Sequence, residues 1–239
     1  MSSRPKRPLL EALGVASLVT ATVTLASALL PDRWVATSVG LVFFGATWLT
    51  VWRGDDEKVL HHGLDFGGVV LPGPIDLRDV FRLTVRAVAW ALALALVFFL
   101  PFFAGFQAWA HWVWHSRHAF VFPSFVAHLG SDAAAQLLIV ALPEEAFYRG
   151  YLQTRLDDAW PARARIFGAT LGPSLLATSA VFALGHYATI PDPARLAVFF
   201  PSLVFGWLRA RTGGVGAPAL FHALCNLFSE SLMRGYWHG

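Results

Sequence analysis

The sequence predicts an all-α fold: a polytopic membrane helix bundle with about seven transmembrane helices and an additional interfacial segment. Of the 239 residues, 56% are hydrophobic and only 14% are charged, whereas soluble domains carry about 25% charged residues. The mean hydropathy is +0.55. Several apolar runs approach the ~20 residues that a membrane-spanning helix needs. We therefore expect a single integral membrane domain over residues 1–239.

Each of the seven expected spans is an apolar run bounded by charged or turn-forming residues. The third is the most continuous, because residues 89–100 are all apolar. The first could also be a signal peptide, since a basic start precedes it and Ala26-Ser27-Ala28 ends it; we favour an uncleaved anchor because the run is long. The expected spans are Leu9–Leu30, Trp34–Trp52, Thr84–Gly105, Ser131–Leu152, Pro173–Ile190, Ala194–Leu208 and Val215–Met233.

Tryptophan and phenylalanine are frequent between the third and fourth spans, in Gln107–Gly130. Such residues favour the headgroup zone, so this is the predicted interfacial segment.

The connections between the spans differ in charge between the two sides of the membrane. If the N-terminus is cytoplasmic, thirteen lysines and arginines fall in inside segments and four in outside segments. Cytoplasmic loops carry the excess of basic residues, which predicts a cytoplasmic N-terminus and an outside C-terminus.

The basic residues do not indicate a nucleic-acid-binding protein. The isoelectric point is about 9.4, but the arginines are scattered between apolar runs and form no continuous basic stretch. The lipid bilayer is instead the expected environment. Arginine greatly outnumbers lysine and alanine is abundant, a bias typical of GC-rich bacterial genomes, so the expected location is a bacterial inner membrane.

Two adjacent glutamates, Glu144 and Glu145, interrupt the apolar fourth span. An ionisable side chain at membrane depth costs roughly 2.5–3.5 kcal/mol even on mild insertion scales, and it indicates a functional site. Arg149 lies four residues after Glu145, so the two share a helix face and can pair. Glu144 points about 100° away from Glu145. The two carboxylates are therefore expected to have different partners.

Two further polar motifs lie on other spans: Phe182-x-x-x-His186 on the fifth, and His222-x-x-x-Asn226 on the seventh. A rise of 1.5 Å per residue places all three motifs at similar depth if the fifth span begins at Pro173. Proline is a natural first-turn residue. This choice of start makes residues 162–172 a cytoplasmic or interfacial segment.

These side chains together fill the roles needed to hydrolyse an amide. A carboxylate such as Glu144 can act as a general base on water, and His186 can orient that water. Hydrogen-bond donors at His222 and Asn226 can stabilise the oxyanion. No cofactor is then required. An alternative is a catalytic zinc site with Glu144, His186 and His222 as ligands. Another is a transporter or proton relay, because buried charges also mark those proteins.

The three motifs, in this order on apolar helices, resemble the CAAX prenyl protease and bacteriocin-processing (CPBP or Abi) family of intramembrane glutamic endopeptidases. The stretch 205–215 also looks like that family's connection into its last motif. The resemblance covers about residues 131–228, and we expect residues 131–233 to form the catalytic core. It implies Glu144 as catalytic base assisted by His186, an oxyanion site at His222 and Asn226, and support from Glu145 and Arg149.

By the same resemblance, the expected function is cleavage of a peptide bond in a membrane-anchored protein or peptide, as C-terminal tail processing or sorting. A catalytically silent immunity or scaffold protein on the same fold remains an alternative. Nothing in the sequence indicates an oligomeric state.

Overall fold

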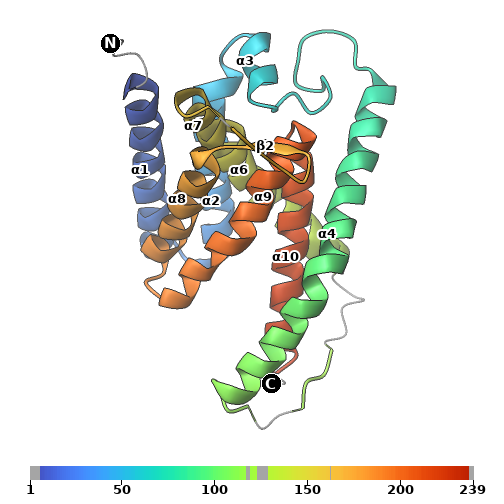
Figure 1. The fold of residues 1–239 in the computed structure, drawn as a ribbon. Coiled ribbons are helices and arrows are strands. Elements are labelled where there is room, and N and C mark those ends of the chain that lie inside the picture. The colour runs from blue at the N-terminus through green and yellow to red at the C-terminus, as the bar shows by residue number, and fades with distance from the viewer. Residues whose placement is uncertain (1–5, 117–118, 123–128, 162, 237–239) are drawn as a thin grey trace.

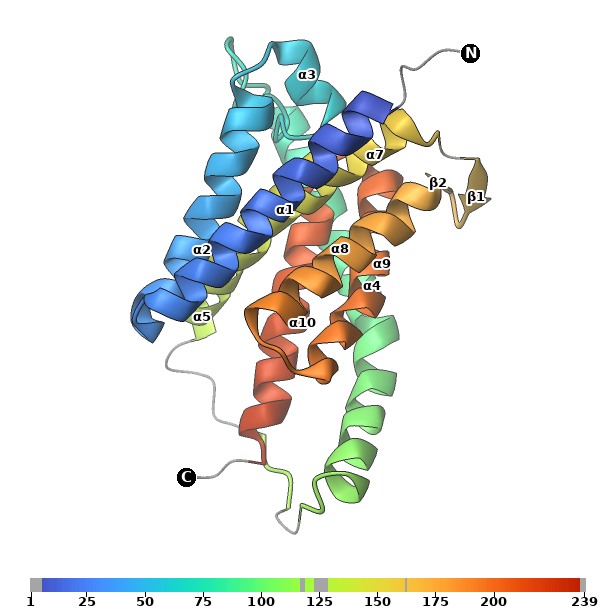
Figure 2. The same cartoon turned by 90° about the vertical axis from the view of Figure 1, so that its left-hand side faces the viewer.

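A computed structural model describes residues 6–116, 119–122, 129–161 and 163–236, and it is a bundle of helices (Figure 1). Its long helices run up and down between two ends of the molecule. The described part of the chain begins at one end and finishes at the other (Figure 1 and Figure 2). This arrangement agrees with an odd number of crossings.

Within the described residues, three helices are long and apolar enough to cross a membrane, and they span residues 8–29, 32–52 and 77–112. They comprise α1 (Lys6–Leu29), α2 (Asp32–Thr47) with its π-helical continuation η1 (Trp48–Trp52), and α4 (Leu77–Trp112). The first three expected spans are thus helical, and α4 extends beyond its expected end at Gly105. The remaining helices are shorter or less apolar, so seven crossings remain a prediction. Most of the interfacial segment after Ser116 lies outside the described residues.

The chain that carries the two glutamates is helical from Leu129 to Ala159. It comprises α5 (Leu129–Ala135), η2 (Gln136–Ala141), α6 (Leu142–Glu145), η3 (Ala146–Gln153) and α7 (Thr154–Ala159). Here η2 and η3 are π-helical, a rare geometry that is frequent at functional sites. Such turns on both sides of the glutamates depart from the regular 3.6-residue helix that the sequence predicts.

A two-stranded antiparallel hairpin follows, which the all-α prediction did not include. It pairs β1 (Ala164–Ile166) with β2 (Ala169–Leu171). Both turn residues have positive φ, 46° at Phe167 and 78° at Gly168, as a tight hairpin turn requires. The hairpin lies within the segment predicted to be cytoplasmic or interfacial. The Trp207 indole N–H donates to the Ile166 carbonyl at 3.0 Å, which attaches the hairpin to the bundle.

The last three expected spans correspond to α8 (Pro173–Thr189), α9 (Phe199–Thr212) and α10 (Gly216–Arg234). The first of these begins at Pro173, as predicted. The sixth span begins later than predicted, because a 3-10 helix, η4 (Pro193–Val198), precedes α9. Asp192 caps it by accepting from the Ala194 N–H at 2.9 Å.

Two apolar clusters hold the bundle together. The larger joins α1 and α2 to the helix of the glutamates and to α8, with Phe43, Phe147 and Phe182 at its centre. Gly40 lets α2 approach the backbone of η2, because a Cβ there would overlap the Ile139 carbonyl oxygen. The smaller cluster joins α4, α9 and α10. The helix of the glutamates belongs to the larger cluster and also contacts α10, so the glutamates lie between these two groups of helices.

A short helix, α3 (Asp56–His61), covers the end of the bundle at which the N-terminus lies (Figure 1). It ends beside His62, whose ring is buried. The Nδ1–H group of His62 donates to the Lys58 carbonyl at 2.8 Å. Among the described residues, Nε2 has no hydrogen-bond partner. Burial lowers the pKa of His62 from its ordinary 6.5 to about 4.

This histidine predicts a loss of stability in acid. Between pH 6.5 and 4 the unfolded chain takes up a proton that the folded protein does not, so the free energy of unfolding falls as pH falls. The shift corresponds to about 3 kcal/mol at most. His62→Asn retains a donor for the Lys58 carbonyl and does not titrate. The expected result is a flatter dependence of unfolding free energy on pH than in the wild type. Equal slopes in His62→Asn and wild type would contradict this assignment.

Candidate active site

A buried ion pair forms the base of the site. The Oε2 atom of Glu145 lies 3.2 Å from Nε of Arg149, and both side chains have no exposed surface. The Arg149 Nη2 atom also donates to Ser202, to its hydroxyl at 2.7 Å and its carbonyl at 3.1 Å. The two residues share a helix face, as predicted. Together they join the helix of the glutamates to α9.

Aromatic rings enclose the guanidinium. The Cζ atom of Arg149 lies 4.7 Å from the ring centroid of Phe182 and 5.2 Å from that of Phe205. Cations are attracted to such ring faces. Phe205 also stacks on the His222 imidazole, with centroids 4.7 Å apart and planes 18° apart. These rings fix the positions of the arginine and of His222 in one packed layer.

His222 connects the two glutamates. Its Nδ1 lies 2.9 Å from Oε1 of Glu145, and because a carboxylate accepts, Nδ1 carries the proton. Its Nε2 lies 4.0 Å from Oε2 of Glu144. The two carboxylates therefore share His222 as a neighbour, although different partners were predicted, and the rest of their surroundings differs. Glu145 is fully buried between an arginine and a histidine, whereas Oε2 of Glu144 is buried without a hydrogen-bond partner in the described part of the chain.

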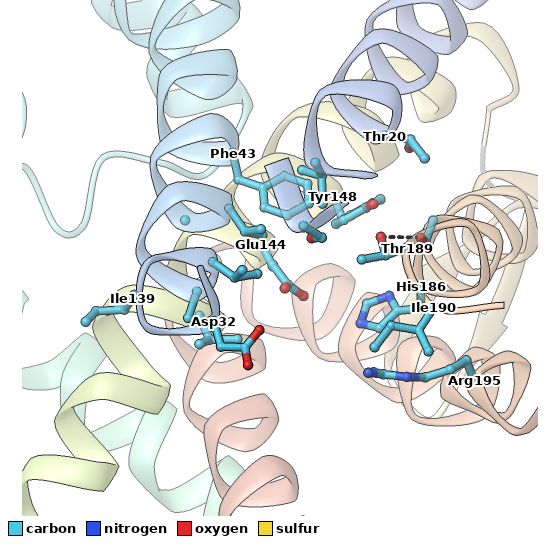
Figure 3. A pocket seen from close by; sticks show the side chains of 18 residues that line it. Thr20, Asp32, Phe43, Ile139, Glu144, Tyr148, His186, Thr189, Ile190 and Arg195 are labelled. Carbon is cyan, nitrogen blue, oxygen red and sulfur yellow. Dashed lines mark hydrogen bonds between the residues drawn. The ribbon is translucent and has the colours of Figure 1, made fainter. Parts of the chain in front are cut away.

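Glu144 faces a cavity of about 520 Å³ between α1, α2, α8 and the helix of the glutamates (Figure 3). Its carboxylate and the His186 ring point toward each other across this space (Figure 3). The polar residues that line the cavity are Thr20, Ser27, Asp32, Glu144, Tyr148, His186, Thr189 and Arg195. The cavity wall therefore includes the N-terminal helices as well as the expected core over residues 131–233.

His186 presents an acceptor to the cavity. Its Nδ1–H group donates to the carbonyl of Phe182 one turn earlier, at 3.0 Å. In the neutral ring the other nitrogen, Nε2, is then a hydrogen-bond acceptor. The Phe182 ring lies 4.4 Å from the imidazole, centroid to centroid, and holds it in place. The Phe182-x-x-x-His186 spacing thus has a local structural reason.

Asn226 lies apart from the cavity-lining residues. Its Nδ2 donates to Oε1 of Gln136 at 3.0 Å, which joins α10 to η2. The amide has two N–H groups, and this bond uses one of them. Gln136 is the polar residue that interrupts the apolar start of the fourth span.

The zinc alternative names Glu144, His186 and His222 as the ligands. Across residues 6–116, 119–122, 129–161 and 163–236, no group of three or more His, Cys, Asp or Glu side chains is placed to hold a metal ion. Glu144, His186 and His222 share one region of the bundle without forming such a group. A catalytic zinc needs three protein ligands at about 2 Å.

Several residues of the site were not identified from the sequence. Ser202 and Phe205 contact Arg149 and His222 from α9. The signal for Ser202 was its place in an apolar run, and Phe205 was noted only as the start of the stretch 205–215. Asp32 and Arg195 lie at the edge of the cavity (Figure 3). Each is a charge next to a span end, where the sequence alone indicates only a residue at the membrane surface.

Fold and site together define a membrane protein in which a buried carboxylate faces a polar, histidine-lined cavity. Residues 131–228, less than half of the chain, match the model of a family described as type II CAAX prenyl endopeptidase Rce1-like. This segment is therefore similar to the CAAX protease family. The resemblance inferred from the three motifs is thereby confirmed. Comparisons with curated proteins and with solved structures gave no match.

Proposed function

We propose that this protein is an intramembrane endopeptidase that hydrolyses a peptide bond in a membrane-anchored protein or peptide. The observation that carries the proposal is the placement of Glu144. Its carboxylate has a buried oxygen without a partner, faces a polar cavity, and lies 4.0 Å from one imidazole and across the cavity from another. A carboxylate of this kind is suited to take a proton from water.

In the proposed reaction, water bound between Glu144 and the Nε2 atom of His186 attacks the peptide carbonyl carbon. Glu144 takes the proton from that water as the new carbon–oxygen bond forms. The proton then passes to the leaving nitrogen as the carbon–nitrogen bond breaks. No cofactor is needed for these steps, and the catalytic core is residues 131–233 with α1 and α2 completing the cavity.

His222 and Asn226 are the proposed donors to the oxyanion. Because the Nδ1–H of His222 is already given to Glu145, its Nε2 can donate to an oxyanion only in the doubly protonated ring. Asn226 has one N–H left after its bond to Gln136. Glu145 and Arg149 act by holding His222 in position.

Oxyanion donors make their strongest contacts in the transition state. His222→Ala and Asn226→Ala are therefore expected to lower kcat about 100-fold or more with a much smaller change in KM. Steady-state cleavage of one tail peptide by each variant measures this split. Gln136→Leu, which removes only the partner of Asn226, should have a weaker effect. A rise in KM with unchanged kcat for either alanine variant would assign these residues to substrate binding instead.

The cavity mouth lies at the end of the bundle opposite to the N-terminus. Both Asp32, at the start of α2, and Arg195, after α8, are at this end. The excess of arginines in the segments at the N-terminal end supports a cytoplasmic N-terminus and an outside C-terminus. In that orientation, within a bacterial inner membrane, the substrate enters from the outer side.

Reconstituted protein tests the function directly. The wild type, in liposomes, is expected to cleave membrane-anchored peptides with C-terminal tails, and chelator-washed protein is expected to retain this activity. A transporter or a silent scaffold of the same fold would leave every such peptide intact. Loss of activity on chelation with recovery on added zinc would instead establish a metal-dependent enzyme.

A further inference from the structure

Arg195 places a positive charge at the mouth of the candidate active site. It lies on η4, lines the same cavity as Glu144, and is half-buried. Its side chain extends toward the mouth beneath His186, and the Asp32 carboxylate lies on the opposite side (Figure 3). An arginine in this position contacts any chain that passes Glu144 and leaves through the mouth.

The guanidinium has no carboxylate partner within the described residues. Asp192, on the same turn, uses its carboxylate to cap the Ala194 N–H. Asp32 is not within ion-pair distance, since all ion pairs of 4.0 Å or less between described residues involve other arginines or histidines. Of the described residues that line the cavity, Arg195 is the one arginine, and its guanidinium can bind an external anion.

A carboxylate fits this group best. The planar guanidinium offers a fork of N–H donors that matches two carboxylate oxygens. A cavity of about 520 Å³ is in the range of a small ligand, so it holds a short peptide segment. When the bond beside Glu144 is near the end of a substrate, the chain's terminal carboxylate comes to lie near the mouth.

We propose that Arg195 binds the C-terminal carboxylate of the substrate tail and so selects peptides that end shortly after the scissile bond. This inference rests on the proposed peptidase function. Hydrolysis releases the tail with a protonated amine at its new end, while its original carboxylate remains on Arg195. The residue positions the substrate and takes no part in the proton transfers.

The test compares one tail peptide with a free C-terminal carboxylate and the same peptide with a C-terminal amide. Charge-assisted hydrogen bonds of this kind predict that amidation lowers kcat/KM about 10- to 100-fold in the wild type, mainly through KM. Arg195→Gln should lose the same factor on the free acid and nothing further on the amide, and Arg195→Lys should lose less. Arg234→Gln, an arginine at the same end that pairs with Glu230, is the control and should cleave both peptides like the wild type.

Equal cleavage of acid and amide by the wild type would overturn the proposal. The proposal would also be overturned if Arg195→Gln lost the same factor in kcat/KM on both peptides and this factor varied with the content of anionic lipid. The arginine would then bind a lipid headgroup. A third peptide is amidated at its C-terminus and has aspartate as its last residue. Its cleavage shows whether a side-chain carboxylate can replace the terminal one. If no peptide is cleaved, the affinities of Glu144→Gln for the acid and for the amide still test the preference for a terminal carboxylate. A failure of the Arg195 proposal can therefore be distinguished from a failure of the peptidase assignment.

Discussion

Replacing Glu144 by glutamine is expected to lower the rate of peptide cleavage about 10³-fold or more. Glutamine has nearly the same shape but cannot accept a proton from water, and loss of a general base typically costs 10²- to 10⁴-fold. The fold should persist, because no hydrogen bond or close ion pair of the bundle depends on the Oε2 atom of Glu144. Single-turnover cleavage by reconstituted Glu144→Gln and wild type measures the change.

Two controls accompany this comparison. Glu230→Gln changes an exposed glutamate that pairs with Arg234 on α10, and it should cleave like the wild type. Binding of an uncleaved peptide to Glu144→Gln should match the wild type, since the base acts on water rather than on the substrate. Cleavage by Glu144→Gln at more than a tenth of the wild-type rate would show that another group activates the water.

Arg149→Met is expected to have the largest effect on stability. Removing one partner of a buried ion pair costs about 3–5 kcal/mol, because the other charge is left uncompensated. Here the Glu145 carboxylate would remain fully buried with His222 as its one partner. The bonds to Ser202 and the contacts with Phe182 and Phe205 would be lost at the same time. The free energy of unfolding in detergent, measured against the wild type, gives the loss.

The double variant Arg149→Met with Glu145→Gln separates charge from packing. A neutral glutamine can still accept from the Nδ1–H of His222, so the uncompensated charge disappears and the double variant is expected to be more stable than Arg149→Met alone. Arg155→Met is a matched control, because Arg155 pairs with Glu11 and Asp158 at the partly exposed end of the bundle. Surface pairs contribute about 0–1 kcal/mol. An Arg149→Met loss no larger than that of Arg155→Met would contradict a structural role for the buried pair.

The sequence predicted the helices whose ends carry local signals. Pro173 marks the start of α8, as predicted. In contrast, α9 continues past its predicted end at Leu208 to Thr212, where Gly213, with φ of 83°, stops it. The pairing of Glu145 with Arg149 was also predictable, because it depends on helical spacing alone. The approach of His222 to both glutamates was inferred only from similar depth, and the structure places the imidazole between them.

The features that the sequence did not predict depend on contacts between distant segments. Ser202 meets Arg149 from 53 residues further along the chain, and no periodic pattern identifies such a partner. The π-helical turns around Glu144 depart from the regular spacing on which the analysis depends. The hairpin at 164–171 is too short to leave an alternating pattern. Arg195 and Asp32 become candidates only when the cavity between α2 and α8 is seen.

The central claim is that Glu144 takes a proton from the water that attacks the peptide bond. A single turnover in ¹⁸O-labelled water, followed by mass spectrometry of product and enzyme, tests it most directly. General-base hydrolysis places one ¹⁸O atom in the new carboxylate of the product and none in the enzyme peptide that contains Glu144. Label in that enzyme peptide, with an unlabelled product, would show that the Glu144 carboxylate attacks the substrate itself and would contradict the mechanism.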